Sequence, residues 1–525
     1  MGFILSRAPT VGVKAVVATS HQLASFSGAN ILKNGGNFVD AAIAASAVLC
    51  VVQNNLCGLG GDTFALVKPA GKKIEGVNGS GRASSEIGID WYRSRGYSEI
   101  PQRGPHAAIT VPGLVHAWGE LHRRYGSMEF RNLLEPAIQY AEAGVPLTPN
   151  YADSIKRSRD SLERFPGWAR IFVPDGNPPS AGSIFVQKEL AASLRTIANE
   201  GPDTMYTGTL AQKMVRGIRR EGGVLSETDF AKHRTDWVQP LSTKYRGIDV
   251  YETAPNSQGA TVLLWLNLLE ELNLSNMSPG EILAKFVDTY KMVNEERRKR
   301  ITDPEFHQLP PDFTSKSYAA KLVTETTSAS GTPVSVDPGD TTYFSVADSE
   351  GNCISMIQSN YMGFGSGMVP EGTGIVLQNR GCYFSLDPTH HNRLEPSKRT
   401  FHTLCACIGL VDERPLFCIG EMGGDIQPQV HVQLITNLID RGMNIQAAID
   451  SPRWCIPGTI YESPKLIQCE EGLFQNIGKS RISELDIQKL QYWSSATGHA
   501  QGVFYLKDGI SAGADPRGDG AAVGF

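Results

Sequence analysis

The stretch that decides the fold of this chain is GDTTYFSVADSEGNCISMIQSNY, Gly339–Tyr361. Apolar and polar residues alternate in the two segments that flank Asp348–Asn352, as they do in β-strands. The composition of Asp348–Asn352 is typical of a hairpin turn. We therefore predict two antiparallel strands joined at this turn. The preceding segment, Val323–Asp340, is rich in Ser, Thr, Gly and Pro and poor in large apolar side chains. It is predicted to be a flexible linker or surface loop.

Thr341 stands at the junction between the predicted linker and the predicted hairpin. If the chain is cut before Thr341, the new α-amine is a base held beside the threonine hydroxyl, which makes the hydroxyl a nucleophile. The reference pKa of such an amine, roughly 7.7 to 8.0, suits proton transfer at neutral pH. An ordinary strand start is the alternative interpretation, and the residues alone leave it open.

Composition and charge exclude several classes of protein. The chain has 525 residues, 41% of them apolar and 20% charged, which is typical of a globular protein of about three domains or one large α/β unit. The net charge of −5 provides no broad basic surface, so we expect no nucleic-acid partner. No apolar run reaches the roughly 18 residues of a membrane span, and Arg7, Pro9 and Lys14 interrupt the N-terminal segment. We expect a cytoplasmic protein without a membrane partner.

Periodicity places helices before the hairpin and further strands after it. Helical patterns lie near residues 113–143, 150–162, 187–219, 260–271 and 279–300. A second hairpin is predicted around Asp412–Pro415. The dense charge cluster Asn294–Arg300 has mixed signs at helical spacing and predicts a solvent-exposed helix face. Nine scattered cysteines predict reduced, mostly buried thiols.

Motifs for other chemistries fit poorly. The glycine-rich segment Cys57–Thr63 matches neither phosphate-binding glycine pattern. In Gly363–Val369, glycines touch Ser366 directly, which is not the GxSxG spacing of a serine hydrolase. The residues that suggest a metal site are His390, His391, His402 and Asp387. Adjacent histidines lack the HExxH spacing, so a polar loop is favoured and we expect no metal.

Many segments, in order, resemble the gamma-glutamyltransferase family of N-terminal-nucleophile hydrolases. They are HQLASFSGANILKNGGNFVDAAIA (21–44), VPGLVHAWGELHRRYG (111–126), PAIQYAEAG (136–144), YTGTLAQKMV (206–215), GGVLSETDFAKH (222–233), PNSQGAT (255–261), the hairpin segment (339–361), EMGG (421–424) and ADPRGDGAAVGF (514–525). The resemblance covers nearly the whole chain.

The resemblance implies the fold and the reactive residues. The fold is α+β, a four-layer αββα sandwich of the N-terminal-nucleophile hydrolase type. By this resemblance, Thr341 is expected to be both the autoprocessing residue and the nucleophile. Cleavage between Asp340 and Thr341 gives a large subunit, 1–340, and a small subunit, 341–525, which together form one catalytic unit. The amides of Gly423 and Gly424 form the oxyanion hole.

Two further residues keep the chemistry of the family pattern. Ser359 occupies the position of a threonine that hydrogen-bonds near the nucleophile's amine, so the hydroxyl is retained. Arg82, in GSGRAS, matches the arginine that pairs with the α-carboxylate of the acyl donor, a task suited to a bidentate guanidinium.

Four positions depart from the family pattern. Tyr361 replaces an asparagine, and Tyr383 replaces the aspartate that holds the donor's α-amino group. His402 and Thr403 replace two serines that bind the α-carboxylate. The segment after Ser385 is also shorter than in members with a lid loop. These changes resemble the acylase and amidohydrolase branch, including oxamate amidohydrolase and cephalosporin-acylase-like members.

The resemblance therefore implies an amidohydrolase or acyltransferase that cleaves a gamma-glutamyl or related carboxylate-bearing amide through an acyl-enzyme. Hydrolysis is preferred to transfer, and no cofactor is required. An oxamate-type or cephalosporin-type amidohydrolase is the alternative. A non-catalytic member acting as a binding protein and a metal or serine hydrolase on another fold also stay open. The expected partners are the small-molecule amide and the two subunits of one chain, with further oligomerisation left open.

Overall fold

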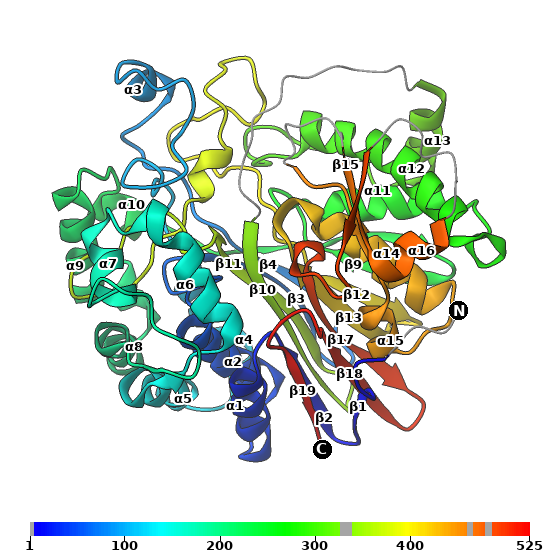
Figure 1. The fold of residues 1–525 in the computed structure, drawn as a ribbon, viewed down its shortest axis with the longest axis horizontal. Helices are drawn as coiled ribbons and strands as arrows, with labels where there is room; N and C mark the ends of the chain where they lie inside the picture. The colour runs from blue at the N-terminus through cyan, green and yellow to red at the C-terminus, as the bar shows by residue number, and fades with distance from the viewer. Residues whose placement is uncertain (1–4, 326–338, 459–465, 478–485) are drawn as a thin grey trace.

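Two antiparallel sheets are stacked face to face and covered on their outer faces by helices (Figure 1). The computed structural model describes residues 5–325, 339–458, 466–477 and 486–525. The helix–sheet–sheet–helix order is the predicted four-layer αββα sandwich, so the α+β fold class is confirmed.

The first sheet carries the predicted hairpin at its centre. Its strands, in spatial order, are β19 (Ala521–Gly524), β2 (Ala15–Thr19), β10 (Gly339–Asp348), β11 (Cys353–Met362), β3 (Asp62–Lys68), β4 (Glu75–Gly79) and β7 (Asp236–Val238). β10 and β11 pair antiparallel. The Asp348 carboxylate accepts the backbone N–H groups of Glu350 and Asn352, which closes the turn. The predicted hairpin is confirmed.

The second sheet faces the first. Its strands, in spatial order, are β1 (Thr10–Gly12), β18 (Gly509–Ala514), β17 (His499–Leu506), β13 (Arg414–Met422), β12 (Cys407–Val411), β9 (Ile248–Glu252) and β8 (Leu241–Tyr245). β12 and β13 form the second predicted hairpin. Tyr343 of β10 lies against Gly420 of β13, where a Cβ would come within 2.2 Å of the ring. The glycine is therefore what lets the two sheets approach at the centre.

Helices cover both outer faces. On the first sheet lie α1 (Gln22–Lys33), α2 (Phe38–Val52), α4 (Leu114–Tyr125), α5 (Phe130–Ala143) and α8 (Lys188–Glu200). On the second lie α11 (Gly259–Leu269), α12 (Pro279–Arg300), α14 (Gln427–Ile439) and α15 (Ile445–Asp450). The predicted helical segments are confirmed, except that 113–143 and 187–219 each contain a break between two α-helices.

The remaining elements are shorter or peripheral. They are α3 (Ile89–Arg93), α6 (Pro149–Leu162), α7 (Pro166–Phe172), α9 (Thr209–Arg220), α10 (Glu227–Ala231), α13 (Lys316–Glu325), α16 (Glu471–Ile477), the strands β5 (Val145–Pro146), β6 (Ile184–Phe185), β14 (Trp454–Cys455), β15 (Leu466–Glu470) and β16 (Asp486–Leu490), and the 3-10 turns η1 (Pro202–Met205), η2 (Leu274–Asn276), η3 (Arg380–Tyr383), η4 (Gly424–Ile426) and η5 (Ser495–Thr497). Most of the predicted linker, residues 326–338, lies outside the described residues.

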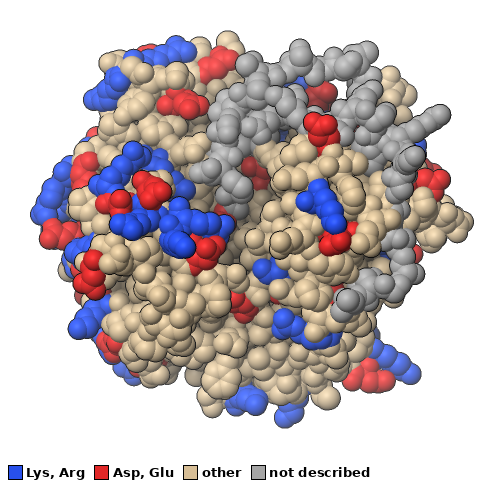
Figure 2. Space-filling model, in the orientation of Figure 1, with Lys and Arg blue, Asp and Glu red and all other residues tan. Residues whose placement is uncertain are grey.

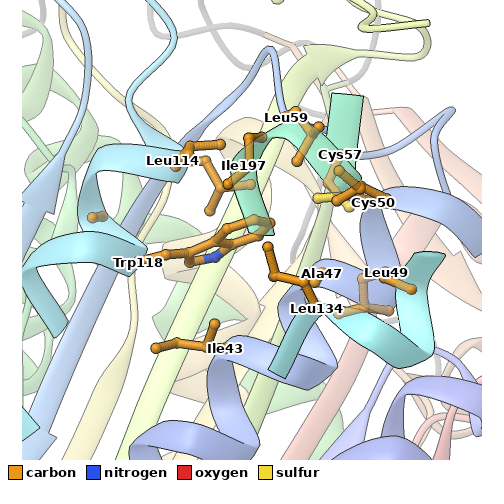
Figure 3. Packing of buried hydrophobic residues seen from close by; sticks show 14 of the residues in the cluster. Ile43, Ala47, Leu49, Cys50, Cys57, Leu59, Leu114, Trp118, Leu134 and Ile197 are labelled. Atoms are coloured by element: carbon orange, nitrogen blue, oxygen red, sulfur yellow. The ribbon is translucent and has the colours of Figure 1, made fainter. Parts of the chain in front are cut away.

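Helix α2 is the central helix of its layer. It begins after Asn37, whose side chain caps the backbone while the Asp40 carboxylate accepts the Asn37 N–H, a capping box. All residues of Phe38–Val52 are buried, so the helix is apolar on every side. Figure 3 shows the Trp118 indole among the apolar side chains of this layer. Its N–H donates to Ser46 Oγ at 2.8 Å, which satisfies the one polar atom of the ring.

The distribution of charged side chains and the burial of the cysteines are those of a typical globular protein. Basic and acidic side chains are interspersed on the face shown in Figure 2. Among the described residues, no helix has both the length and the apolar character needed to cross a bilayer. All nine cysteines are unpaired, and every one except the half-buried Cys382 is buried, as predicted.

Candidate active site

Thr341 lies in β10 at an irregularity in the pairing with β11. Asp340 faces Tyr361 and Thr342 faces Gln358, so the single residue Thr341 opposes two residues of β11. Such bulges re-aim side chains and are frequent beside active sites. β10 begins two residues before Thr341, and the threonine is only 1% exposed. The candidate nucleophile is therefore held inside the sheet.

A chain of hydrogen bonds connects Thr341 to the carbonyl of the residue before it. Thr341 Oγ1 donates to Ser359 Oγ at 3.2 Å, and Ser359 Oγ donates to the Asp340 carbonyl oxygen at 2.6 Å. The Tyr361 backbone N–H donates to Ser359 Oγ at 2.7 Å. The Ser359 hydroxyl thus uses its one donor and both acceptor positions, which fixes its orientation.

Gly423 follows the last residue of β13, Gly424 is the first residue of η4, and η4 contacts β10. Gly424 has a φ of +58°, a left-handed conformation that favours glycine. Its carbonyl accepts Gln258 Nε2 at 2.9 Å, and the side-chain oxygen Oε1 of Gln258 in turn accepts Arg297 Nη1 at 2.5 Å. These bonds hold the glycine segment in place beside the strand of the candidate nucleophile.

A polar cleft of about 470 Å³ opens between these two segments, because Asp340 and Met422 both line it. The other lining residues are Gln53, Asn55, Leu56, Arg103, Asn150, Tyr151, Ser154, Arg157, Ser158, Ser161, Gly363, Ser495, Ala496, His499 and Asp519. The cleft gives small polar molecules access to the neighbourhood of the Asp340–Thr341 bond.

Tyr361 and Tyr383 pack against each other, with their rings tilted by 48°, beside a buried arginine. Their ring centroids are 4.8 Å apart, and the Arg380 guanidinium lies 4.1 Å from the Tyr361 ring centroid, a cation–π contact. The Tyr383 hydroxyl donates to the Asp425 carboxylate. Burial raises the pKa of both phenols well above the usual value, so both stay neutral. Tyr361 also has a φ of +78°, a strained conformation for an aromatic residue.

His402 and Thr403 point to different partners. Thr403 Oγ1 accepts Arg380 Nη1 at 3.0 Å. His402 Nδ1 accepts the Leu404 N–H, so the other ring nitrogen carries the proton and donates to the Asp62 carboxylate at 3.1 Å. Burial and the Arg380 charge lower the His402 pKa, which keeps the imidazole neutral.

Asp62 links this pair to the nucleophile strand, because it faces Ser359 across β3 and β11. Its carboxylate accepts the backbone N–H groups of Gly81 and Gly113 and the amide of Gln378. Burial raises the pKa of Asp62 to about 7 against the effect of these donors.

Arg82 is already paired within the chain. Its guanidinium lies 3.1 Å from the buried Asp303 carboxylate and 2.5 Å from that of Glu305, and it also donates to the Ser397 carbonyl at 3.2 Å. Two internal carboxylates therefore occupy the arginine that the resemblance assigns to the substrate's carboxylate. That assignment stays a prediction.

The prediction of a solvent-exposed face at Asn294–Arg300 was wrong, because Asn294, Glu296 and Arg297 are all buried. The most buried of the three is Arg297. Its side chain is fully buried; besides Gln258, it reaches the carboxylate of Asp425 at 3.5 Å. The usable signal was its helical spacing from Tyr290 and Val293, which are buried on the same face of α12. The many charged residues of Asn294–Arg300 led to the prediction of an exposed face in spite of this spacing.

The four residues considered as metal ligands do not form a site. His390 and His391 stack on one another, whereas His402 is buried on Asp62. In the described part of the chain, one other group has ligand atoms close enough for a metal, with all three atoms within 4.8 Å: Glu252, Cys405 and His431. His431 Nδ1 and Glu252 already share a 2.7 Å hydrogen bond.

Comparison with known proteins decides the family. The model of the gamma-glutamyltranspeptidase family matches residues 24–525. The chain belongs to this family. A glutathione hydrolase-like proenzyme of Bacillus subtilis is 40% identical over 98% of this chain and 99% of its own length. An oxamate amidohydrolase proenzyme of Klebsiella pneumoniae is 35% identical, with 98% and 99% covered.

Comparison with solved structures supports the same family assignment. The crystal structure of cephalosporin acylase from Bacillus halodurans superposes with a TM-score of 0.92 and 36% identity, over 100% of this chain and 98% of that one. The resemblance drawn from the sequence is confirmed, and so is the expectation of a family hydrolase synthesised as a proenzyme. A hydrolase on another fold is excluded.

Proposed function

We propose that this family member is an autoprocessed N-terminal-threonine amidohydrolase whose nucleophile is Thr341. The observation that carries the proposal is the hydrogen-bond chain from Thr341 through Ser359 to the Asp340 carbonyl. It places a hydroxyl nucleophile next to the Asp340–Thr341 peptide bond, together with a second hydroxyl that donates to the carbonyl of that bond. If Thr341 were merely a residue at the start of a strand, neither of these hydroxyl groups would be needed at this position.

Autoprocessing follows from this geometry. Thr341 Oγ attacks the Asp340 carbonyl carbon, and the Ser359 hydroxyl donates to the oxygen as it becomes negative. The carbon–nitrogen bond then breaks, the nitrogen takes the proton lost by the hydroxyl, and Asp340 is left as an ester on Thr341 Oγ. Water cleaves the ester. The products are the Asp340 carboxylate and the free α-amine of Thr341, and therefore subunits 1–340 and 341–525.

The processed enzyme repeats the same chemistry on a substrate. The Thr341 amine takes the hydroxyl proton, and Oγ attacks the amide carbonyl of the substrate. The amides of Gly423 and Gly424 donate to the oxyanion. The leaving amine departs with a proton, and water hydrolyses the acyl-enzyme. No step requires a cofactor.

The substrate class we propose is a small amide whose acyl part carries a carboxylate. The names of two relatives, oxamate amidohydrolase and cephalosporin acylase, belong to amide-cleaving proteins outside the gamma-glutamyl class. Tyr361 and Tyr383 stand where gamma-glutamyl enzymes place an asparagine and an aspartate. The nearby carboxylate, Asp425, already accepts the Tyr383 hydroxyl and pairs with Arg297, so it is not available as the partner of a substrate ammonium. We therefore favour hydrolysis of such amides over gamma-glutamyl transfer.

Intact mass under denaturing conditions tests the proposal first. We expect two species instead of one 57.0 kDa chain, with the smaller beginning Thr341-Thr342-Tyr343 by N-terminal sequencing. Cleavage at any other bond would refute Thr341 as the nucleophile. A single uncut chain from freshly purified and from aged protein would refute autoprocessing at Thr341.

Ser359→Ala is expected to slow autoprocessing by about 10²- to 10³-fold, because loss of one donor to a developing oxyanion has an effect of that size. The rate is measured by following the uncut chain over time. Ser359→Thr keeps a hydroxyl and should process within roughly tenfold of the natural chain. Equal rates for the natural chain and Ser359→Ala would show that this hydroxyl does not stabilise the oxyanion.

A further inference from the structure

Arg380, which the sequence analysis did not single out, is a buried cation with unused donors. Its side chain is 1% exposed, and one hydrogen bond holds it, from Nη1 to Thr403 Oγ1. Nε and Nη2 have no hydrogen-bond partner, and no carboxylate of the described residues lies within ion-pair distance. Burial of a guanidinium without a counter-ion is costly, so such a group indicates a ligand.

The two unused atoms form a fork. In a guanidinium, Nε–H and the Nη2–H on the same side are parallel, and this pair fits the two oxygens of one carboxylate. The third nitrogen, Nη1, is the one bound to Thr403. The side of the guanidinium that recognises carboxylates is therefore the side that is free.

Arg380 is connected to both halves of the proposed catalytic site. On one side its guanidinium lies on the ring of Tyr361, which faces Asp340 across β10 and β11. On the other side Thr403 accepts it, and the Thr403 carbonyl and the Gly424 carbonyl share the Gln258 amide as donor. The positive charge thus lies between the strand of the nucleophile and the glycines of the oxyanion hole.

Nearby groups do not neutralise Arg380. Asp62 is the acidic residue whose charge acts on it, but the Asp62 carboxylate is held by Gly81, Gly113, Gln378 and His402. Tyr361, Tyr383 and Cys382 also face it, and burial keeps these three groups neutral.

We propose that Nε and Nη2 of Arg380 bind the carboxylate of the acyl donor, so that the substrates are short monoamides of dicarboxylic acids without a required ammonium group. This inference rests on the proposed amidohydrolase function and specifies its substrate. Arg82, which the resemblance assigns to the same task, is paired with Asp303 and Glu305. Among the described residues, Arg297 also has Nε and Nη2 without a hydrogen bond, but its Nη2 lies 3.5 Å from the Asp425 carboxylate. Arg380 has no such ion pair with a described residue, so its carboxylate fork is the one without a counter-ion.

The test compares matched anionic and neutral amides. The processed enzyme is assayed with oxamate, malonamate, succinamate and glutaramate, and with neutral amides of the same lengths. We expect the anionic member of at least one pair to be preferred. In Arg380→Met, the anionic-to-neutral ratio of kcat/KM should fall by about 100- to 1000-fold, the effect of removing one partner of a buried charged pair. In Arg380→Lys, which keeps a positive charge, this ratio should be higher than in Arg380→Met but lower than in the natural enzyme.

Binding provides a readout independent of turnover. Oxalate, malonate and succinate are added singly to the processed protein, and at least one should raise its Tm. That shift should be absent in Arg380→Met, whose own Tm should equal or exceed that of the natural protein because an unpaired buried charge is removed. Arg195→Met, which removes an exposed arginine paired with Glu142, is the matched control and should keep both ratio and shift.

Specific outcomes overturn the inference. One is a natural enzyme that cleaves neutral amides as well as anionic ones. Another is an anionic preference that Arg82→Gln abolishes and Arg380→Met retains. Failure of the proposed function has a different signature, an uncut chain or no amide turnover at all. In that case the dicarboxylate shift in Tm, measured on the protein as purified, still decides whether Arg380 is a carboxylate site.

Discussion

Thr341→Ala is expected to remain a single 57.0 kDa chain with no measurable amidase activity. Alanine has no Oγ, so neither the ester with Asp340 nor the acyl-enzyme can form, and loss of the nucleophile in comparable enzymes lowers kcat by about 10⁶-fold. The fold should survive, because Ser359 still accepts the Tyr361 N–H and still donates to the Asp340 carbonyl. Intact mass and amide hydrolysis are the two measurements.

Thr342→Val is the matched control for that experiment. Thr342 is buried next to Thr341, and its hydroxyl makes a long 3.5 Å bond to the Gln358 backbone carbonyl and contacts the Cys57 thiol. Valine has the same shape, so processing and hydrolysis should continue. A Thr341→Ala chain that is cut and active would show that another group is the nucleophile and would overturn the proposed mechanism.

The central hairpin was predictable because its signal is local. Alternation and a turn of Asp, Gly and Asn residues lie within one short segment, Gly339–Tyr361. The bulge at Thr341 was not predictable from that segment. It depends on register with β11, and the stacking of the two sheets depends on close approaches such as that of Gly420 to Tyr343.

Some residues of the candidate site could also be predicted from the sequence, whereas others could not. Thr341, Ser359 and the glycine pair stand in segments that resemble the family, and the structure brings them to neighbouring strands and loops. Arg297 and Arg380 were missed because arginine is by default a surface residue. Their burial follows from distant partners, Gln258 for one and Thr403 for the other, which no short pattern contains.

Arg517→Met is expected to lower the free energy of unfolding by about 3–5 kcal/mol, because it leaves buried carboxylates without a partner. Arg517 is fully buried and binds Glu470 through two hydrogen bonds of 2.7 and 2.6 Å, and Asp515 through one of 3.1 Å. Urea unfolding in the uncut Thr341→Ala chain measures the change without subunit dissociation. Arg195→Met removes an exposed pair and should not change the midpoint.

The pH dependence of this effect separates lost charge pairing from lost packing. Burial alone would raise the pKa of Asp515, but the charges of Arg453 and Arg517 lower it to about 2, below the unfolded value of about 3.9. Asp515 therefore contributes stability above about pH 4, and this contribution is lost as the pH falls towards 2. The difference between Arg517→Met and its parent should shrink over the same interval, because the parent loses the stabilising contribution of the ionised Asp515 there. A difference that stayed constant would indicate that Arg517 acts by packing.

The same ion cluster supports the wall of the cleft. Arg453 donates to Asp515 and to the carbonyls of Thr497 and Gly498, and Ser495, Ala496 and His499 line the cleft beside Asp340. Loss of Arg517 should therefore raise KM more than it lowers kcat in the processed enzyme, because it displaces residues that border the substrate and leaves the Thr341–Ser359 pair in place. An equal loss in both constants, or none, would show that the cluster stabilises the fold without shaping the cleft.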